Sequence, residues 1–519
     1  MCGTTRKHSL TIGPDSSVFL FLLFVPFVTF CGHPSPESSV RSLIWFRNDL
    51  RVADNTALAS ACARADAGVV AVFLVARKQW EQHDWGSPKI DFILRNVAAL
   101  SDAMMKLHIP LHIIECETFN AAPKAIAKLS KEQQCDAVFF NREYEVNELA
   151  RDAAATALCT KEGLEVAVFD DQTLLPPDEL RTGAGQFYRV FTPFKKAWID
   201  AVTKRLPVQI WAVPKMRNDV KLGSTSSPTL PQSLPKREGS ADENIAKLWP
   251  AGEGEAHRRL KSFIASAIVR YKDDRDFPAI DGTSTLSPYL SAGVISPRQC
   301  LTAAMAANDG RIDTGERGIT TWISELIWRE FYRHVIVGFP RVCRYQPFKP
   351  ETKRIVWRED DAGFAAWCEW KTGVPLVDAA MRQLNATGWM HNRLRMVSAM
   401  FLTKDLFIDW HRGERYFMQK LVDADLAQNN GGWQWSASTG TDAAPYFRIF
   451  NPISQSRKFD PRGSFIRQYC PELRELDDDM IHDPSELPPL VRGQLDYPEP
   501  IVNHSEARAR VMEAFGAIK

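Results

Sequence analysis

Short apolar runs alternate with helix-like stretches between residue 43 and about residue 175, and this alternation restricts how that part of the chain can fold. Five runs have the length and composition of buried strands: 43–46, 69–75, 111–115, 137–140 and 166–169. Residues 88–107, between the second and third runs, carry apolar side chains with a helical period. Strands that alternate with helices over short connections form a parallel sheet covered by helices on both faces. The sequence therefore predicts a doubly wound α/β domain. No GxGxxG motif follows the first strand, so a dinucleotide site is not expected in this half.

The strand pattern ends before the second half of the chain. Residues 218–244 are rich in Ser, Pro, Lys and Gly and have little apolar content, which is typical of an exposed linker. From about residue 250, helical patterns dominate, as in 319–337, 376–384 and 393–410. A chain of 519 residues is long enough for two cores. We therefore expect an α/β domain at 40–212, a linker at 213–249 and an all-α domain at 250–519.

Residues 1–39 differ from the rest of the chain. Arg6, Lys7 and His8 precede an apolar run at 18–31, which has the length of a signal h-region and is short for a membrane span. Two interpretations stay open: a targeting presequence, or a translation start nearer the first strand. A membrane anchor is less favoured than either.

The ten cysteines are scattered and form no CxxC pair. This spacing fits neither a zinc site nor a disulfide framework, so it favours a reducing compartment. The formal net charge of +1 decides nothing about nucleic acid, because a local basic patch can be hidden in a global balance.

One predicted helix, within 321–334, carries an unusual mixture of side chains. Glu325, Trp328, Arg329 and Tyr332 have the spacing i, i+3, i+4 and i+7, so they share one stripe of the helix. Two large aromatic groups beside a carboxylate and a guanidinium suit a cavity for a flat, polar, aromatic ligand. The alternative is an ordinary amphipathic helix with a buried tryptophan and a solvated Glu–Arg pair.

Two further clusters repeat this composition. On a second predicted helix Trp389, Asn392, Arg393 and Met396 share a face, with Arg395 beside it. The stretch 423–435 combines carboxylates, amides, paired glycines and two tryptophans. Asp, Asn and Gly are poor helix formers, and paired glycines indicate close approach of the backbone to a ligand. A metal site is not expected there, because nearby histidine ligands are missing.

Basic residues are in excess around these clusters. Residues 381–420 hold seven Lys or Arg against three acids, and 441–470 hold five against two. Such an excess beside an aromatic cavity fits binding of a phosphate backbone, although an ordinary solvated surface would have the same composition.

Seven stretches together resemble the photolyase/cryptochrome family: LIWFRNDLRVADNTAL, YEVNELARD, FYRVFTPFKKAW, DFPAIDGTSTLSPYLSAG, ELIWREFYRH, WMHNRLRM and DADLAQNNGGWQWSASTGTDAAPYFRIFNP. The resemblance runs from residue 41 to the C-terminus and is closest to class I cyclobutane pyrimidine dimer photolyases of bacterial type. It implies a lyase that repairs UV-damaged DNA with light. In that reaction an excited, reduced flavin gives an electron to the dimer and later recovers it.

The resemblance implies FAD bound among the helices of the second domain. The residues expected around it are Tyr271, Thr283, Ser284, Thr285, Leu286, Ser287, Trp322, Arg395, Asp423, Ala424, Asp425 and Asn429. Asn429 has a neutral amide that can accept a hydrogen bond from a reduced flavin. Plant cryptochromes typically have Asp at this position, so Asn429 favours repair over signalling. Trp433, Trp410 and Trp357 resemble the tryptophan chain that re-reduces the flavin in light; without the resemblance they would be interpreted as core residues.

The resemblance also implies base flipping, because the lesion must leave the duplex to reach the flavin. The residues expected to contact the lesion or DNA are Arg275, Glu325, Trp328, Arg329, Tyr332, Asn392, Arg393, Met396, Trp435 and Gln455. We expect Glu325 to be largely desolvated. In (6-4) photolyases two histidines stand at the positions of Asn392 and Met396, so acid–base chemistry on a (6-4) product is not expected.

The α/β domain is expected to carry an antenna pigment, methenyltetrahydrofolate. Asn147 and Glu148, with Cys343 and Arg344 from the second domain, match the folate-type site. Arg344 replaces the lysine that is usual in the nearest relatives, and it keeps the charge but not the geometry.

Three alternatives stay open at this point: a cryptochrome photoreceptor, a (6-4) photolyase and a non-catalytic nucleic-acid-binding module. The last would explain the basic patches but not the Asp/Asn/Trp cluster. The expected partner is UV-damaged DNA. We expect the protein to be a monomer that binds no membrane and needs no protein partner. The compartment is expected to contain DNA and to be reducing: the bacterial cytoplasm, or a plastid or mitochondrion if the presequence is real.

Overall fold

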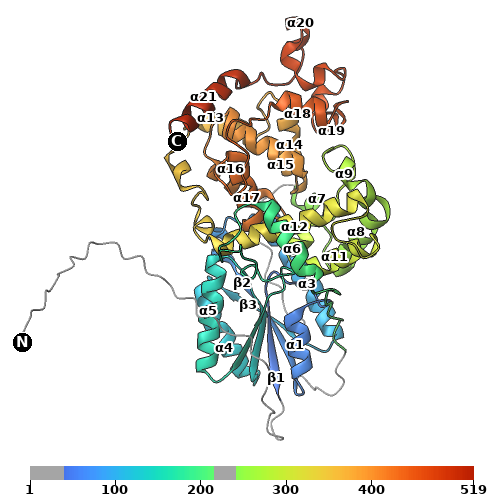
Figure 1. Cartoon of the computed structure of the whole chain (residues 1–519), viewed down its shortest axis with the longest axis vertical. Helices are drawn as coiled ribbons and strands as arrows, with labels where there is room; N and C mark the ends of the chain where they lie inside the picture. The colour runs from blue at the N-terminus through green and yellow to red at the C-terminus, as the bar shows by residue number, and fades with distance from the viewer. Residues whose placement is uncertain (1–39, 216–240, 519) are drawn as a thin grey trace, which may run out of the picture. The chain divides into compact units, whose positions relative to one another are not determined.

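A five-stranded parallel sheet forms the first domain of the computed structural model, which describes residues 40–215 and 241–518 (Figure 1). Its strands are β1 (Arg41–Phe46), β2 (Gly68–Ala76), β3 (Leu111–Cys116), β4 (Ala137–Asn141) and β5 (Glu165–Phe169). They lie in the order β3-β2-β1-β4-β5. All five predicted strands are confirmed, each bound within two residues. The possible presequence lies outside the described residues.

Helices cover both faces of this sheet, as predicted. The helices are α1 (Thr56–Arg64), α2 (Arg77–Gln82), α3 (Ser87–Lys106), α4 (Ala122–Glu132), α5 (Val146–Lys161) and α6 (Phe191–Thr203). Ile44 and Phe46 pack on the face with α1 and α3, whereas Leu43 and Trp45 pack on the face with α4 and α5 (Figure 1). All nine residues of β2 are buried. A central strand of such a sheet is apolar along its whole length because helices shield both of its faces from water.

Helices are the regular elements of the second domain, and its described residues contain no strand, only one isolated bridge between Arg358 and Ile408. Its helices are α8 (Glu253–Ser266), α9 (Tyr271–Asp274), α10 (Ser287–Ser291), α11 (Pro297–Ala306), α12 (Arg317–Gly338), α13 (Asp361–Cys368), α14 (Pro375–Thr387), α15 (Asn392–Met400), α16 (Trp410–Lys420), α17 (Leu426–Ala437), α18 (Pro452–Phe459), α19 (Ser464–Tyr469), α20 (Pro489–Arg492) and α21 (His504–Gly516). Short 3-10 turns connect several of them. No helix in the described ranges is long and apolar enough to cross a membrane.

The predicted helix 393–410 is wrong as a single element. Helix α15 ends at Met400, a π-helical turn follows at Phe401–Asp405, and α16 begins only at Trp410. The chain turns between them because Phe407 has a left-handed backbone, and Asp409 caps α16 by accepting from the His411 amide. Trp389 precedes α15, which starts at Asn392, so it is not on one helix with Asn392 and Met396, although all three side chains line the same cavity.

Helix α17 (Leu426–Ala437) includes most of the stretch 423–435, although the composition of that stretch disfavours a helix. The Asp425 side chain caps it by accepting from the Gln428 amide at 3.2 Å. Packing against α12, α15 and α16 then outweighs the low propensity of its residues.

The last part of the predicted linker is ordered as helix α7 (Ala241–Leu248). Ile245 and Trp249 are buried there, and the Trp249 indole donates to the Thr387 carbonyl at 2.8 Å. The burial of these two apolar side chains stabilises α7 against the rest of the helical domain. The rest of the linker, 216–240, lies outside the described residues.

A buried ion network joins the sheet domain to the helical domain. Asp171, just after β5, accepts from Arg51 and from Arg298, the latter at 2.6 Å. Arg298 also pairs with Asp54 at 3.0 Å. Burial raises the pKa of Asp171, but the two guanidinium groups outweigh burial and hold that pKa well below its usual range. Each buried charge therefore depends on its partners across the domain boundary.

We expect Asp171→Ala to lower the free energy of unfolding by about 3–5 kcal/mol, because it removes the buried carboxylate that pairs with Arg51 and one of the two that pair with Arg298. Equilibrium unfolding in urea measures this. The control is Asp200→Ala, which removes the exposed pair with Lys204 and should cost less than about 1 kcal/mol. Equal effects of the two substitutions would contradict the role of the network.

Candidate functional site

A cavity of about 500 Å³ lies among α9, α10, α12, α15, α16 and α17. It collects predicted residues from segments more than 150 residues apart in the sequence. The predicted residues that line it are Tyr271, Arg275, Ser284, Ser287, Trp322, Glu325, Trp328, Arg329, Tyr332, Asn392, Arg395, Met396, Asp423, Ala424, Asp425, Asn429, Trp433 and Trp435. Its volume falls in the range of small-molecule sites.

The predicted stripe of α12 lines this cavity, which confirms the helical spacing inferred from the sequence. One face of the Trp328 ring stacks on Phe191, with ring centroids 3.6 Å apart. Arg329 donates to the Gln172 carbonyl at 2.6 Å, and burial lowers its pKa to about 10. The stripe is therefore held in place by contacts to the first domain, and a contact of Arg329 with DNA stays a prediction.

Two carboxylates at the start of α17 are paired with arginines. Arg395 donates to Asp423 at 2.8 Å, and Arg333 donates to Asp425 at 2.6 Å. The second carboxylate oxygen of Asp423 is buried and has no hydrogen-bond partner within the described part of the chain. A buried acceptor without a partner costs free energy, so this oxygen is available to a donor on a ligand.

The backbone between these carboxylates is fixed from the first domain. Lys89 of α3 donates to the Ala424 carbonyl at 2.6 Å, and Ser291 donates to the same oxygen at 3.2 Å. Burial raises the pKa of Asp425, but Arg333, Arg329 and Lys89 outweigh it and lower that pKa overall. Asp425 thus stays ionised while it caps α17.

The paired glycines of α17 have different surroundings. A Cβ on Gly431 would lie 2.3 Å from the Tyr332 ring, so this glycine allows a close approach to a protein side chain. A Cβ on Gly432, which lines the cavity, would meet no atom within 4 Å. Only Gly432 therefore leaves room beside the cavity, whereas the sequence suggested a ligand for both.

Glu414 is a neighbour of the cavity that the sequence reasoning missed. The Asn429 amide donates to the Glu414 carboxylate at 3.0 Å and to its backbone carbonyl at 2.9 Å. Burial raises the pKa of Glu414 to about 7. One signal could have revealed it: Glu414 shares the apolar stripe of α16 with Trp410, Phe417 and Met418. A carboxylate on an apolar stripe is uncommon unless it has a partner.

The segment predicted to bind phosphate and ribose is only partly at the cavity. Tyr271, Ser284 and Ser287 line it, whereas Thr283, Thr285 and Leu286 do not. The Thr285 hydroxyl accepts from Arg259 at 2.9 Å, and Leu286 is buried in the core. The hydroxyl-bearing residues of this segment that line the cavity are thus Tyr271 and the two serines.

Arg275 and Glu325 form a partly exposed ion pair in the cavity lining, which we call the mouth, and a second ion pair lies beside it outside the lining. Arg275 donates to Glu325, and Arg393 pairs with Asp276 at 2.8 Å. The Glu325 side chain is 31% exposed, so the expectation that it is largely desolvated is wrong for this structure. Its salt bridge explains the difference, because the arginine holds it at the mouth. Arg393 and Gln455 are not among the residues that line the cavity.

The three predicted relay tryptophans belong to one apolar cluster. Trp433 lines the cavity, Trp410 is fully buried, and Trp357 is partly buried against Phe407. Trp367, which the sequence reasoning did not single out, contacts Trp433 with ring centroids 6.0 Å apart. Trp433 therefore lies at the cavity wall, Trp357 is the least buried of the three, and their redox role stays a prediction.

The predicted antenna residues meet at the start of α5. Tyr144 and Val146 pack with Cys343 of the second domain. Asn147 hydrogen-bonds to His83 at 2.9 Å. Burial, and then the nearby Glu145 carboxylate, raise the pKa of Glu148 well above its usual value. Arg344 is exposed. The two predicted halves of this site are brought together, but its ligand is not tested by these contacts.

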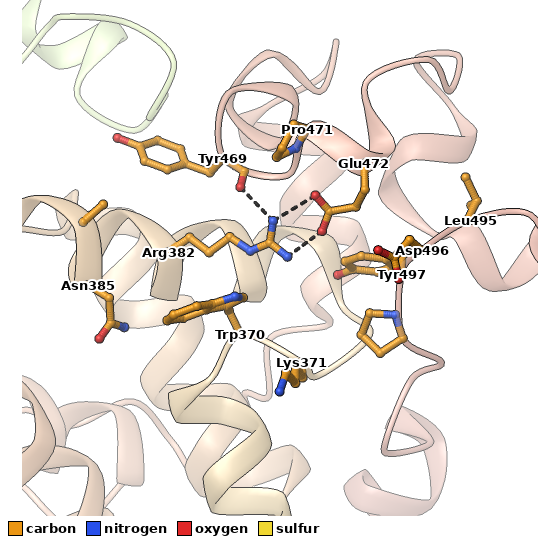
Figure 2. A pocket seen from close by; sticks show the side chains of 12 residues that line it. Trp370, Lys371, Arg382, Asn385, Tyr469, Pro471, Glu472, Leu495, Asp496 and Tyr497 are labelled. Atoms are coloured by element: carbon orange, nitrogen blue, oxygen red, sulfur yellow. Dashed lines mark hydrogen bonds and ion pairs between the residues drawn. The ribbon is translucent and has the colours of Figure 1, made fainter. Parts of the chain in front are cut away.

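A second cavity, of about 970 Å³, lies elsewhere in the helical domain (Figure 2). Arg382 donates to the Glu472 carboxylate at 2.9 Å and to the Tyr469 carbonyl at 3.0 Å there, so its two terminal nitrogens are occupied, whereas its Nε has no partner among the described residues (Figure 2). None of the predicted site residues lines it. Within 40–215 and 241–518, no cluster of three His, Cys, Asp or Glu residues could hold a metal ion.

Known proteins match both halves of the chain. Residues 42–212 match the family described as DNA photolyase, and residues 322–517 match the FAD binding domain of DNA photolyase. The deoxyribodipyrimidine photo-lyase of Salmonella typhimurium is 46% identical over 477 residues, covering 92% of this chain and 98% of the relative. That of Escherichia coli is 44% identical, with the same shares covered.

Two solved structures resemble the chain closely. A bacterial class III photolyase from Agrobacterium tumefaciens has a TM-score of 0.84 at 35% identity, covering 93% of this chain and 98% of that one. A cryptochrome from Synechocystis sp. PCC6803 has a TM-score of 0.81 at 28% identity, covering 92% and 100%. The domain arrangement inferred above is therefore that of a known family.

We expect Glu414 to make stability depend on pH. Its folded pKa of about 7 lies above its ordinary value of 4.5, so its protonated form favours the folded state. That contribution is complete below about pH 4.5 and is lost as the pH rises through about 7, by up to about 3 kcal/mol.

Glu414→Gln removes this loss, so the variant should gain stability relative to the unchanged chain between pH 4.5 and pH 8. Urea unfolding at several pH values measures the difference. Glu369→Gln, at an exposed glutamate, is the matched control and should show no such trend. A pH-independent difference for Glu414→Gln would mean that this carboxylate is ionised throughout.

Proposed function

The chain belongs to the photolyase/cryptochrome family, and we propose that it splits cyclobutane pyrimidine dimers in DNA in a light-dependent reaction. The observation that carries the proposal is the content of the cavity. Its lining combines the aromatic rings of Trp328 and Trp435 and the Glu325 carboxylate with the Asn429 amide and the Arg395–Asp423 pair. This combination suits a flavin and an extruded base pair better than a non-catalytic surface.

The residues of the cavity fit FAD. The unpaired oxygen of Asp423 suits a ring N–H, the open side of Gly432 leaves room for a flat ring, and the hydroxyls of Ser284 and Ser287 suit phosphate oxygens. When bound and reduced, FAD supplies the electron that light drives to the dimer. Arg395 and Asp423 orient the ring, and Asn429 offers a neutral amide oxygen beside it because its N–H₂ group is used by Glu414.

The mouth residues receive the lesion. Trp328 and Trp435 offer π faces to an extruded pyrimidine dimer, and Glu325 can hydrogen-bond a pyrimidine carbonyl or imide. Asn392 and Met396 contribute shape and an amide but no proton near neutral pH. Dimer splitting needs position and electrostatics rather than acid–base catalysis, which is why these residue types support a cyclobutane dimer over a (6-4) product.

Trp433, Trp410 and Trp357 would restore the reduced flavin in light by passing an electron inward. Their common apolar cluster keeps water away from the aromatic rings. Asn147, Glu148, Cys343 and Arg344 would hold methenyltetrahydrofolate as the antenna. The buried, unpaired oxygen of Glu148 supports a ligand with a polar hydrogen there.

A cryptochrome photoreceptor is the second candidate, because the Synechocystis cryptochrome shares the fold at a TM-score of 0.81. Such a receptor would hold the same flavin without splitting a lesion. The monomeric state and the compartment, bacterial cytoplasm or a eukaryotic organelle, stay predictions.

One repair assay separates these functions. The purified protein, whose bound chromophores are recorded by absorption, is incubated with oligonucleotides that contain a cyclobutane dimer or a (6-4) product, with and without blue light. We expect repair of the cyclobutane dimer in light alone. Repair of the (6-4) product would assign the other enzyme class, and repair of neither would favour a photoreceptor.

Glu325→Ala should slow dimer splitting by about tenfold, which corresponds to the loss of one hydrogen bond to a charged group. Flavin content should not change, because Glu325 stands at the mouth of the cavity. Repair yield per absorbed photon and flavin absorption measure the two effects, and Glu325→Gln, which keeps a hydrogen-bonding group, should lose less. Loss of flavin from Glu325→Ala would show that this residue belongs to the cofactor site instead.

A further inference from the structure

Two consecutive residues, Arg275 and Asp276, lie at the mouth of the cavity, where Arg275 is part of the lining and Asp276 stands next to it. They follow the short helix α9, and each pairs with a residue of a different helix. Arg275 donates to Glu325 of α12, and Asp276 accepts from Arg393 of α15 at 2.8 Å. This short segment therefore links helices α12 and α15 through ion pairs.

Both ion pairs are open to water and can be exchanged. The exposed fractions of the side chains are 19% for Arg275, 31% for Glu325, 16% for Arg393 and 32% for Asp276. Ion pairs that are partly open to water contribute little net stability, so an incoming group of suitable charge can displace either partner.

The charges of the four side chains cancel. Arg275 and Arg393 are the groups proposed to face DNA, yet in the free protein each is neutralised by an acid. A DNA phosphate can replace a carboxylate on Arg393, since guanidinium groups bind both. The same phosphate is repelled by Asp276 as long as that carboxylate stays beside Arg393.

A further partner for Asp276 lies close by. The Nε atom of Arg275 is 3.9 Å from the Asp276 carboxylate. While Arg275 is paired with Glu325, Asp276 has Arg393 as its nearer partner. If Glu325 turns to an extruded base, Arg275 is released and can take Asp276, which frees Arg393 for a phosphate. Every charge then keeps a partner.

We propose that Asp276 is a built-in competitor for the DNA phosphate on Arg393, which makes the protein favour damaged over undamaged DNA. On an undamaged duplex no base engages Glu325, so Arg275 stays occupied and Asp276 keeps Arg393. On a damaged duplex the lesion triggers the exchange. This role of Asp276 as a specificity-determining residue rests on the proposed repair function.

The test compares Asp276→Asn with Asp273→Asn in the full-length, flavin-containing protein. Asp273 lies exposed in the same segment, so both substitutions remove one negative charge close to the mouth. Binding to matched duplexes with and without one cyclobutane dimer is measured in the dark at several salt concentrations.

Relative to Asp273→Asn, we expect Asp276→Asn to bind the undamaged duplex about fivefold more tightly. Its affinity for the damaged duplex should rise by less than about twofold, so discrimination falls. In a chain that also carries Arg393→Gln, Asp276→Asn should have no effect beyond that of Asp273→Asn.

Equal behaviour of Asp276→Asn and Asp273→Asn on undamaged DNA overturns the inference, and so does a full effect in the Arg393→Gln background. In both cases light-dependent repair by the unchanged chain would leave the proposed function standing. If the unchanged chain neither prefers nor repairs the dimer, the proposed function fails and the inference fails with it. Flavin absorption and urea unfolding of each variant exclude misfolding as the cause.

Discussion

Buried ion pairs across the domain boundary are the interaction on which the rest of the structure depends. Asp171 of the sheet domain binds Arg51 and Arg298, one from each domain. Such a network adds little net stability compared with apolar packing, but it is costly to break, so it defines one arrangement of the two domains. The shape of the cavity depends on this arrangement, because several of the residues that line it are held in place by contacts with the sheet domain.

Helix α12 shows how this works. On one side its Glu330 accepts from the Leu174 amide and from the Trp198 indole, the latter at 2.6 Å, which attaches the helix to the first domain. On the other side Glu325 and Trp328 line the cavity. Arg333, further along, binds both Asp425 and Glu145, so the cap of α17 is also tied to the sheet domain. The positions of the cavity residues thus follow from contacts made outside it.

The sequence predicted the parts of this structure that depend on local patterns. Five apolar runs were sufficient for the sheet, and i, i+3, i+4 spacing was sufficient for the stripe of α12. Errors arose where a single residue redirects the chain, as Asp409 does by capping α16. The ion pairs of Glu325 and the contact of Glu414 with Asn429 join distant segments, so no local pattern encodes them. Most cavity residues were reached by resemblance to a family rather than by physics alone.

The bond from Lys89 to the Ala424 carbonyl has an evolutionary consequence. The stretch at the centre of the cavity takes part of its backbone geometry from a helix in the other half of the chain. The two halves are therefore not interchangeable modules, even though each matches a family of its own. Recombination at the linker between distant relatives would join two halves whose charged residues at the domain boundary evolved against different partner domains. Lineages of such proteins should therefore inherit both halves together.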